Sequence, residues 1–170
     1  EKVQEVTSTL ASAGIRAEAD YRDMSPGWKF NEWEMKGVPI RIEMGPRDIE
    51  SNQCMLFRRD TLEKKAVSLD NLAETIANEL KDIQKYMLEK SRKMRDERIV
   101  TATDLDGILN GVENKCFVKA DWCGCRECED KIKEVAQATS RVIADGEPIT
   151  GKCAVCGKEA KHTVYFARAY

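Results

Sequence analysis

The feature of this sequence that most constrains its fold is a pair of cysteine clusters near the C-terminal end. Cys123, Cys125 and Cys128 lie in the run DWCGCRECED, and Cys153 and Cys156 lie in GKCAVCGKEA. Two residues separate Cys125 from Cys128, and two separate Cys153 from Cys156. Pairs with this spacing are typical of zinc sites in which four thiolates hold one tetrahedral ion at about 2.3 Å. The sequence therefore predicts that the two clusters converge on a metal ion.

The four sulfur donors indicate whether this site is structural, catalytic or redox-active. Four thiolates fill the coordination sphere of zinc and leave no position for water, so we expect a structural rather than a catalytic site. A thioredoxin-type redox pair is disfavoured because it would leave the second cluster unused. His162, the only histidine, is a further ligand candidate but is expected to be an ordinary strand or surface residue. Spacing alone leaves open whether Cys123 or Cys125 joins Cys128, and it favours Cys125.

Composition excludes several classes of protein. The 170 residues are 42% hydrophobic and 34% charged, as in soluble globular proteins, and no run of about 18 apolar residues predicts a membrane span. An odd number of cysteines, seven, of which five lie in two close clusters, favours metal ligation in a reducing compartment, so we expect a cytoplasmic protein without a membrane partner. The net charge of -2 neither supports nor excludes nucleic-acid binding, which must rest on local surfaces.

Hydrophobic periodicity predicts a first domain over residues 1–98. Its clearest element is a long helix at about 69–97, in which apolar residues recur every three or four positions. Strands and helices alternate before it and predict an α/β fold with a mixed sheet. The other expected elements are a helix at about 2–13, strands at about 15–20, 38–44, 53–60 and 64–69, and a short helix near 29–36.

A second, smaller α+β domain is predicted over residues 99–170. The elements become shorter after residue 98, and this part holds six of the seven cysteines. We expect a helix at about 104–110, a strand at 115–120, a helix at 126–137, and strands at 140–144 and 163–168.

Residues 26–48, PGWKFNEWEMKGVPIRIEMGPRD, resemble the anticodon-binding domain of the prolyl-tRNA synthetases, which are class II aminoacyl-tRNA synthetases. The resemblance continues through the long helix, the cysteine-rich region and the terminal TVYFARAY, and it is closest to the archaeal and eukaryotic form, whose chain ends in Tyr. It implies a class IIa anticodon-binding domain that lacks its first strand, followed by a zinc-binding domain.

The same stretch contains the side chains expected to bind RNA. Arg41 on a predicted strand, and Arg47 and Asp48 after a Gly-Pro turn, offer donors and acceptors for base edges, although a solvated strand face is the alternative. The resemblance implies that Glu34, Arg41, Arg47 and Asp48 contact the anticodon bases, with the arginines donating and the carboxylates accepting. It also implies a further basic residue within 59–65, which the sequence does not single out.

The resemblance implies a zinc ligand set as well. In this family the first pair is commonly separated by four residues, which selects Cys123 with Cys128, joined by Cys153 and Cys156. Cys125 would then be a spare thiol beside a structural Zn²⁺ ion.

The activity implied by the resemblance belongs to a longer protein. The chain does not begin with Met and contains no class II catalytic motif, so we expect a fragment that is inactive alone. The parent is expected to use ATP and Mg²⁺ to join proline to tRNA(Pro), as a homodimer. The expected partners are the tRNA(Pro) anticodon loop and the missing catalytic domain, towards which the terminal Tyr170 points in this family. The alternative is a zinc-stabilised protein-interaction module with no specific RNA reading.

Overall fold

The computed structural model describes residues 1–144, 146, 149 and 151–169. The expectation for Tyr170 lies outside the described residues. The chain divides into two compact units, Glu1–Lys90 and Ser91–Tyr170. The predicted domain boundary at residue 98 stays a prediction.

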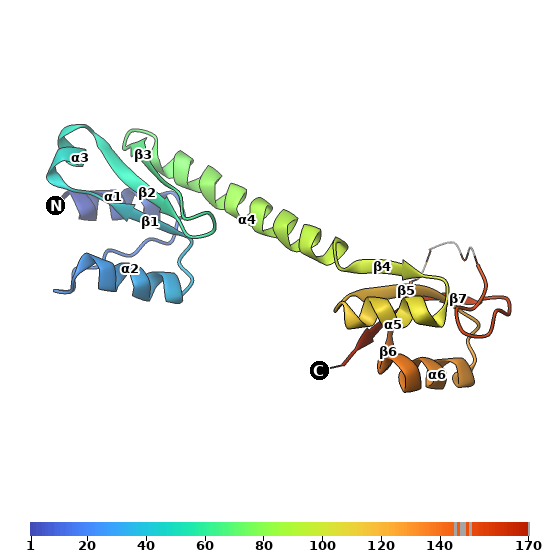
Figure 1. Ribbon diagram of the computed structural model, residues 1–170. Coiled ribbons are helices and arrows are strands. Elements are labelled where there is room, and N and C mark those ends of the chain that lie inside the picture. The colour runs from blue at the N-terminus through green and yellow to red at the C-terminus, as the bar shows by residue number, and fades with distance from the viewer. Residues whose placement is uncertain (145, 147–148, 150, 170) are drawn as a thin grey trace. The chain divides into compact units, whose positions relative to one another are not determined.

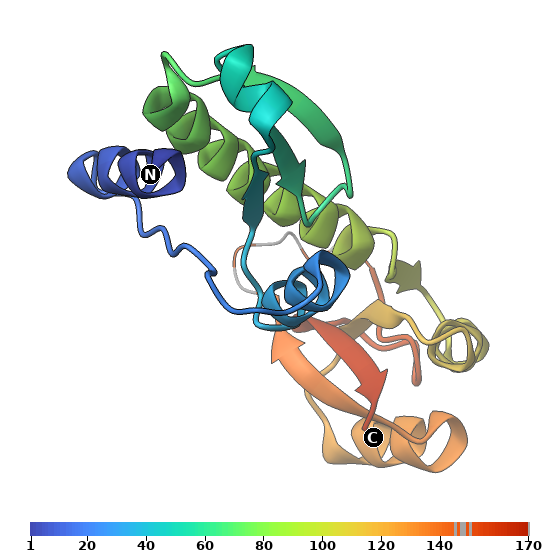
Figure 2. The same cartoon turned by 90° about the vertical axis from the view of Figure 1, so that its left-hand side faces the viewer.

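The first unit is a three-stranded antiparallel sheet with helices on both faces (Figures 1 and 2). Val6 and Leu10, four residues apart on the first helix, form one core with Leu56 of the sheet and with Leu72 and Ile76 of the long helix. The elements in chain order are α1 (Lys2–Ser12), α2 (Pro26–Met35), β1 (Ile40–Glu43), α3 (Pro46–Glu50), β2 (Gln53–Arg58), β3 (Lys64–Ser68) and α4 (Leu72–Asp96).

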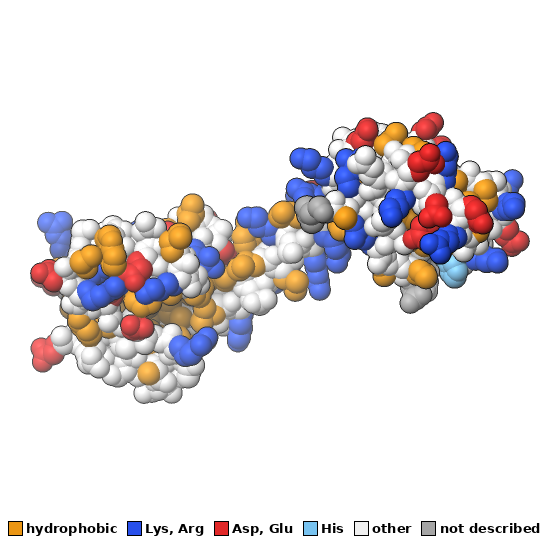
Figure 3. Space-filling view, turned by 90° about the horizontal axis from the view of Figure 1, so that it is seen from below, with side chains coloured by type: hydrophobic (Ala, Val, Ile, Leu, Met, Phe, Trp, Pro, Cys, Tyr) orange, Lys and Arg blue, Asp and Glu red, His pale blue; other side chains and the backbone are white. Residues whose placement is uncertain are grey.

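The second half of α4 is exposed rather than packed, and it presents apolar as well as charged side chains. Ile83 is the last buried residue that the structure describes in this helix. Figure 3 shows lysine and arginine side chains gathered along its later turns. The exposed basic residues of this stretch are Lys85, Lys90, Arg92, Lys93 and Arg95. This part of α4 therefore has a solvated surface, unlike its first three turns.

The second unit is a four-stranded sheet with two helices packed on it. Its strand order is β4-β5-β7-β6, in which β4 and β5 are parallel and the other pairs are antiparallel. The core contains Ile108, Val112, Ile132, Val164 and Phe166. The elements are β4 (Ile99–Ala102), α5 (Leu105–Glu113), β5 (Phe117–Trp122), α6 (Arg126–Ala136), β6 (Ala138–Ile143) and β7 (His162–Arg168).

Close approach of α5 to the sheet depends on a glycine. A Cβ at Gly111 would lie 2.5 Å from a methyl group of Val118 on β5 and 2.9 Å from a methyl group of Val100 on β4. Helix α5, which connects β4 to β5, therefore packs on the sheet through its backbone at Gly111, where a side chain would not fit.

The α/β fold with a mixed sheet is confirmed, and most predicted elements are present. The mixed pairing lies in the second unit, whereas the described strands of the first sheet are all antiparallel. The strand predicted at 15–20 is wrong, because no described strand pairs with it and alternation alone does not form a ladder. Two short elements, α3 and β4, were not predicted. Within the described residues, no helix has the length and apolar character needed to cross a membrane.

Candidate RNA interface and metal centre

Arg41 lies at the centre of the candidate RNA interface, held against two aromatic rings. On the sheet, Arg41 of β1 is opposite Phe57 of β2, and Phe57 is opposite Lys64 of β3. These three residues therefore share the face opposite the core. The guanidinium carbon of Arg41 lies 4.1 Å from the ring centre of Phe57 and 3.8 Å from that of Phe30 on α2. Contacts of this kind restrict the guanidinium plane.

Carboxylates complete this arrangement. Arg41 donates hydrogen bonds to Glu34 on α2 and to Glu43, the latter from Nε at 3.0 Å. Lys64 donates to the other oxygen of Glu43 at 2.7 Å. Burial alone would raise the pKa of Glu43, but the hydrogen bonds from Lys64 and Arg41 outweigh burial and lower it. We call Glu34, Arg41, Glu43 and Lys64 the Arg41 cluster.

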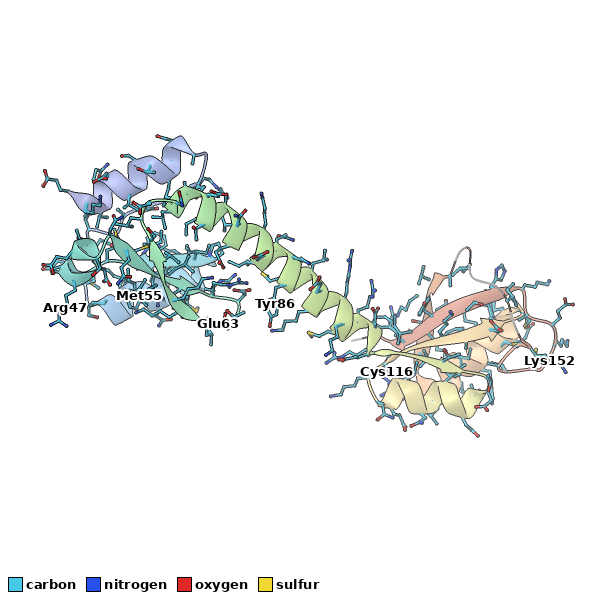
Figure 4. The ribbon with its side chains drawn as sticks, turned by 90° about the horizontal axis from the view of Figure 1, so that it is seen from above. Arg47, Met55, Glu63, Tyr86, Cys116 and Lys152 are labelled. Atoms are coloured by element: carbon cyan, nitrogen blue, oxygen red, sulfur yellow. The ribbon has the colours of Figure 1, made fainter. Side chains whose placement is uncertain are left out.

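Arg47 and Asp48 lie on α3, directly after β1. Pro46 is the first residue of this helix, and the Asp48 carboxylate accepts a hydrogen bond from the Gly45 N–H at 2.9 Å. That bond fixes the turn that ends β1. The Arg47 side chain is exposed and projects from the unit, and it makes no hydrogen bond or ion pair to another described residue (Figure 4).

The structure thus brings two of the four predicted RNA-binding residues into contact. Glu34 and Arg41 are in direct contact, whereas no described hydrogen bond or ion pair connects Arg47 or Asp48 to the Arg41 cluster. Sequence reasoning missed Phe57 and Lys64 as neighbours of Arg41. Only the register of the strands places them there.

The candidate metal centre lies in the second unit. The sulfur atoms of Cys123, Cys128, Cys153 and Cys156 are all within 4.8 Å of one another. Cys123 lies 3.6 Å from Cys128 and 3.8 Å from Cys156, sulfur to sulfur. A tetrahedron of sulfurs around zinc requires separations of about 3.8 Å. These four residues could therefore hold a metal ion, and their spacing fits zinc.

The loop that carries Cys153 is built to present a thiolate. The Cys153 N–H donates to the Lys158 carbonyl at 2.8 Å, and Gly157, with φ of 69°, donates to the Cys153 carbonyl at 2.9 Å. Burial alone would raise the pKa of the Cys153 thiol, but backbone N–H groups of Cys156 and Val155 lower it to about 6. The thiolate is the form that binds metals.

The remaining candidate ligands stand outside this set of four. The Cys125 sulfur lies 3.3 Å from that of Cys123 and 3.2 Å from that of Cys128, but it does not belong to the group in mutual reach. His162 begins β7 and faces Trp122, with the two ring centres 6.0 Å apart. The geometry thus favours Cys123 as the fourth ligand.

Two family models match this chain. Residues 1–79 match the model "Anticodon binding domain", and residues 105–170 match "Prolyl-tRNA synthetase, C-terminal". The chain belongs to the prolyl-tRNA synthetase family. It corresponds to the C-terminal portion of these synthetases, as two separate kinds of similarity agree.

The first kind is sequence similarity to curated prolyl-tRNA synthetases. The proline–tRNA ligase of Ruminiclostridium cellulolyticum is 51% identical over 100% of this chain and 36% of that protein. The proline–tRNA ligase of Alkaliphilus oremlandii is 56% identical over 92% of this chain and 33% of that protein.

The second kind is structural. A crystal structure of prolyl-tRNA synthetase from Cryptosporidium parvum, complexed with L-proline and AMP, matches with a TM-score of 0.93 and 35% sequence identity. The match covers 99% of this chain and 37% of that synthetase. The chain therefore spans about a third of the length of the synthetases it matches. The archaeal and eukaryotic form stays a prediction.

Proposed function

We propose that this chain reads the anticodon of tRNA(Pro) and forms the C-terminal part of a protein that attaches proline to that tRNA. Residues 1–98 would be the anticodon-binding domain, and residues 99–170 a domain held together by structural zinc. The observation that carries the RNA-binding proposal is the Arg41 cluster, together with the anticodon-binding family model over residues 1–79.

The Arg41 cluster suits recognition of guanine, which occupies the second and third positions of proline anticodons. An arginine fork can donate to guanine O6 and N7, and a carboxylate can accept from guanine N1 and N2. Arg41 is already oriented by two rings, so little side-chain freedom is lost when a base binds. We propose Arg41 and Arg47 as donors, and Glu34 and Asp48 as acceptors.

Strand register supports Lys64 as the further basic residue expected within 59–65. Lys64 lies on the same sheet face as Arg41 and forms an ion pair with Glu43. The neighbouring Lys65 faces the opposite side, where it donates to Glu79 of α4 at 2.6 Å. We propose that Lys64 contacts the RNA and that Lys65 stabilises the fold.

The parent protein has further proposed properties. We propose that it is a cytoplasmic homodimer of the archaeal and eukaryotic form, in which a catalytic domain binds ATP, Mg²⁺ and proline. The match to the C-terminal model and the four-cysteine cluster support the assignment of the form. The zinc ion would be bound by Cys123, Cys128, Cys153 and Cys156, and it would supply cross-linking rather than catalysis.

Binding of anticodon stem-loops tests the proposal. A stem-loop with the proline anticodon should bind this chain, and replacing either guanine should weaken binding by about 1–3 kcal/mol. Lys64→Ala should weaken binding of the proline stem-loop, measured by fluorescence anisotropy at fixed salt.

Lys65→Ala is the matched control for this experiment, because it removes the same charge from the opposite sheet face. It should leave the affinity for the stem-loop within about twofold. Equal binding of all stem-loops would contradict specific reading. Together with the absence of any effect of Lys64→Ala, it would favour the zinc-stabilised interaction module instead.

A further inference from the structure

Cys125 and Cys128 form a pair whose setting differs from that of the other thiols. Cys125 is the N-cap of α6, which follows β5, and Cys128 lies in the first turn of this 11-residue helix. Their sulfur atoms are 3.2 Å apart. Reactive dithiols with a Cys-X-X-Cys spacing occupy the same position, at the start of a helix. The sequence analysis disfavoured such a pair, yet the local structure supplies its geometry.

We propose that Cys125 and Cys128 form a peroxide-sensitive dithiol inside the metal centre, and that their oxidation to a disulfide withdraws Cys128 from the zinc ligands. This inference rests on the zinc site of the proposed function, but it does not depend on RNA binding. It assigns a role to Cys125, the one thiol of the two cysteine clusters that the four-cysteine site leaves unused.

Exposure and ligation indicate which sulfur reacts first. Cys125 is half-buried, whereas Cys123, Cys128 and Cys153 are buried. Cys156 is exposed, but as a zinc ligand its sulfur would share its lone pair with the metal. Cys125 therefore combines partial access from solvent with a sulfur outside the proposed zinc ligands, which are the properties that make a thiol susceptible to peroxide.

The proposed chemistry is a two-electron oxidation by hydrogen peroxide in two steps. The Cys125 sulfur attacks one peroxide oxygen, the O–O bond breaks, and Cys125 becomes a sulfenic acid while hydroxide leaves and takes up a proton. The Cys128 sulfur, which would be a thiolate when it holds zinc, then attacks the Cys125 sulfur; the S–S bond forms, the S–O bond breaks, and the leaving hydroxide takes a proton from solvent to give water, while Cys128 no longer binds the metal. Overall, one thiol, one thiolate, one proton and one peroxide give one disulfide and two waters.

The backbone allows this disulfide. Residues three apart in the first turn of a helix have Cα atoms about 5 Å apart, within the range that disulfides require. The two sulfurs need to approach by only about 1.2 Å to reach bonding distance. Disulfide formation leaves Cys123, Cys153 and Cys156 as the remaining ligands, so affinity for zinc should fall.

Peroxide titration of the zinc-loaded chain tests this proposal. We expect zinc release, followed with a chromophoric chelator, to accompany a mass loss of about 2 Da per chain. Peptide mapping should locate the disulfide between Cys125 and Cys128. Dithiothreitol and added zinc should restore the starting mass and metal content.

Two serine variants provide the comparison. Cys125→Ser should bind zinc at the same stoichiometry as the parent chain and release it at least about tenfold more slowly under peroxide. Cys116→Ser, which removes a thiol of the same unit outside the cluster (Figure 4), should release zinc at the parent rate.

Three outcomes would overturn the proposal. They are zinc release from Cys125→Ser at the parent rate, a disulfide at Cys156 or Cys123, and loss of zinc from untreated Cys125→Ser. Absence of zinc from the untreated parent chain would instead refute the proposed metal site. The disulfide map of that metal-free chain would still report whether Cys125 and Cys128 pair.

Discussion

Replacing Arg41 with alanine should destabilise the first unit by about 2–3 kcal/mol. Arg41 contacts two rings, each contributing about 0.5–1 kcal/mol. It also makes two partly exposed ion pairs, each contributing about 0.5–1 kcal/mol. The sum is about 2–4 kcal/mol, and we expect its lower half because contacts that share one side chain are not additive.

Urea unfolding followed by tryptophan fluorescence measures this change. The first unit contains Trp28 and Trp33, and the second contains Trp122, so a Trp122→Phe background restricts the signal to the first unit. Arg41→Met is the matched variant, because it keeps a long apolar side chain between the rings and loses the charge. It should lose about half as much stability as Arg41→Ala.

The result that would refute this reasoning is a free energy of unfolding for Arg41→Ala within about 0.5 kcal/mol of its parent, which is the range of an ordinary surface substitution. Equal losses for Arg41→Met and Arg41→Ala would show that only the charge matters. The ring contacts would then contribute nothing.

Further substitutions test packing, acid stability and the metal centre. Gly111→Ala should destabilise the second unit by about 1–3 kcal/mol in thermal unfolding, because its Cβ would overlap Val118, whereas Gly27→Ala on α2 meets open space and should be neutral or stabilising. Hydrogen bonds from Lys65 and Arg58 lower the pKa of Glu79 below its ordinary value of 4.5, although burial opposes them. The ionised Glu79 carboxylate therefore contributes its full stability to the first unit above pH 4.5, and this contribution is lost as the pH falls through the folded-state pKa. Glu79→Gln should make urea midpoints less dependent on pH in that acidic range, and an unchanged pH profile would contradict this. Cys153→Ala should abolish zinc binding, which metal analysis measures, and it should unfold the second unit without unfolding the first. If the variant retained one zinc per chain, Cys153 would be excluded as a ligand.

Helices whose apolar residues repeat regularly over many positions were predictable from the sequence. The three-four spacing of apolar residues located α1 and α4 to within a few residues, because burial of one helix face imposes that spacing. β4 was missed because four residues are too few to show alternation. The Gly45-Pro46 pair predicted only a turn, although proline is also favoured at the first position of a helix, where α3 begins.

The two candidate sites differ in how far sequence determines them. Cysteine spacing predicted that the two clusters converge, because each cluster is local and only one long loop must close. It favoured Cys125, however, whereas the four sulfurs in mutual reach include Cys123. The contact of Arg41 with Phe57 and Lys64 was not predictable, because it depends on which residues of three strands lie opposite one another. A shift of one residue in that register would have moved Lys64 to the other face.

The arrangement of the four cysteines has a consequence for the folding of the second unit. An ion bound by Cys123 and Cys156 would close a loop that contains α6 and β6. Closing a loop of this length restricts the unfolded chain by about 3–4 kcal/mol of entropy if it behaves like a covalent cross-link. The fraction of chains that complete this unit would then depend on the supply of free zinc during synthesis.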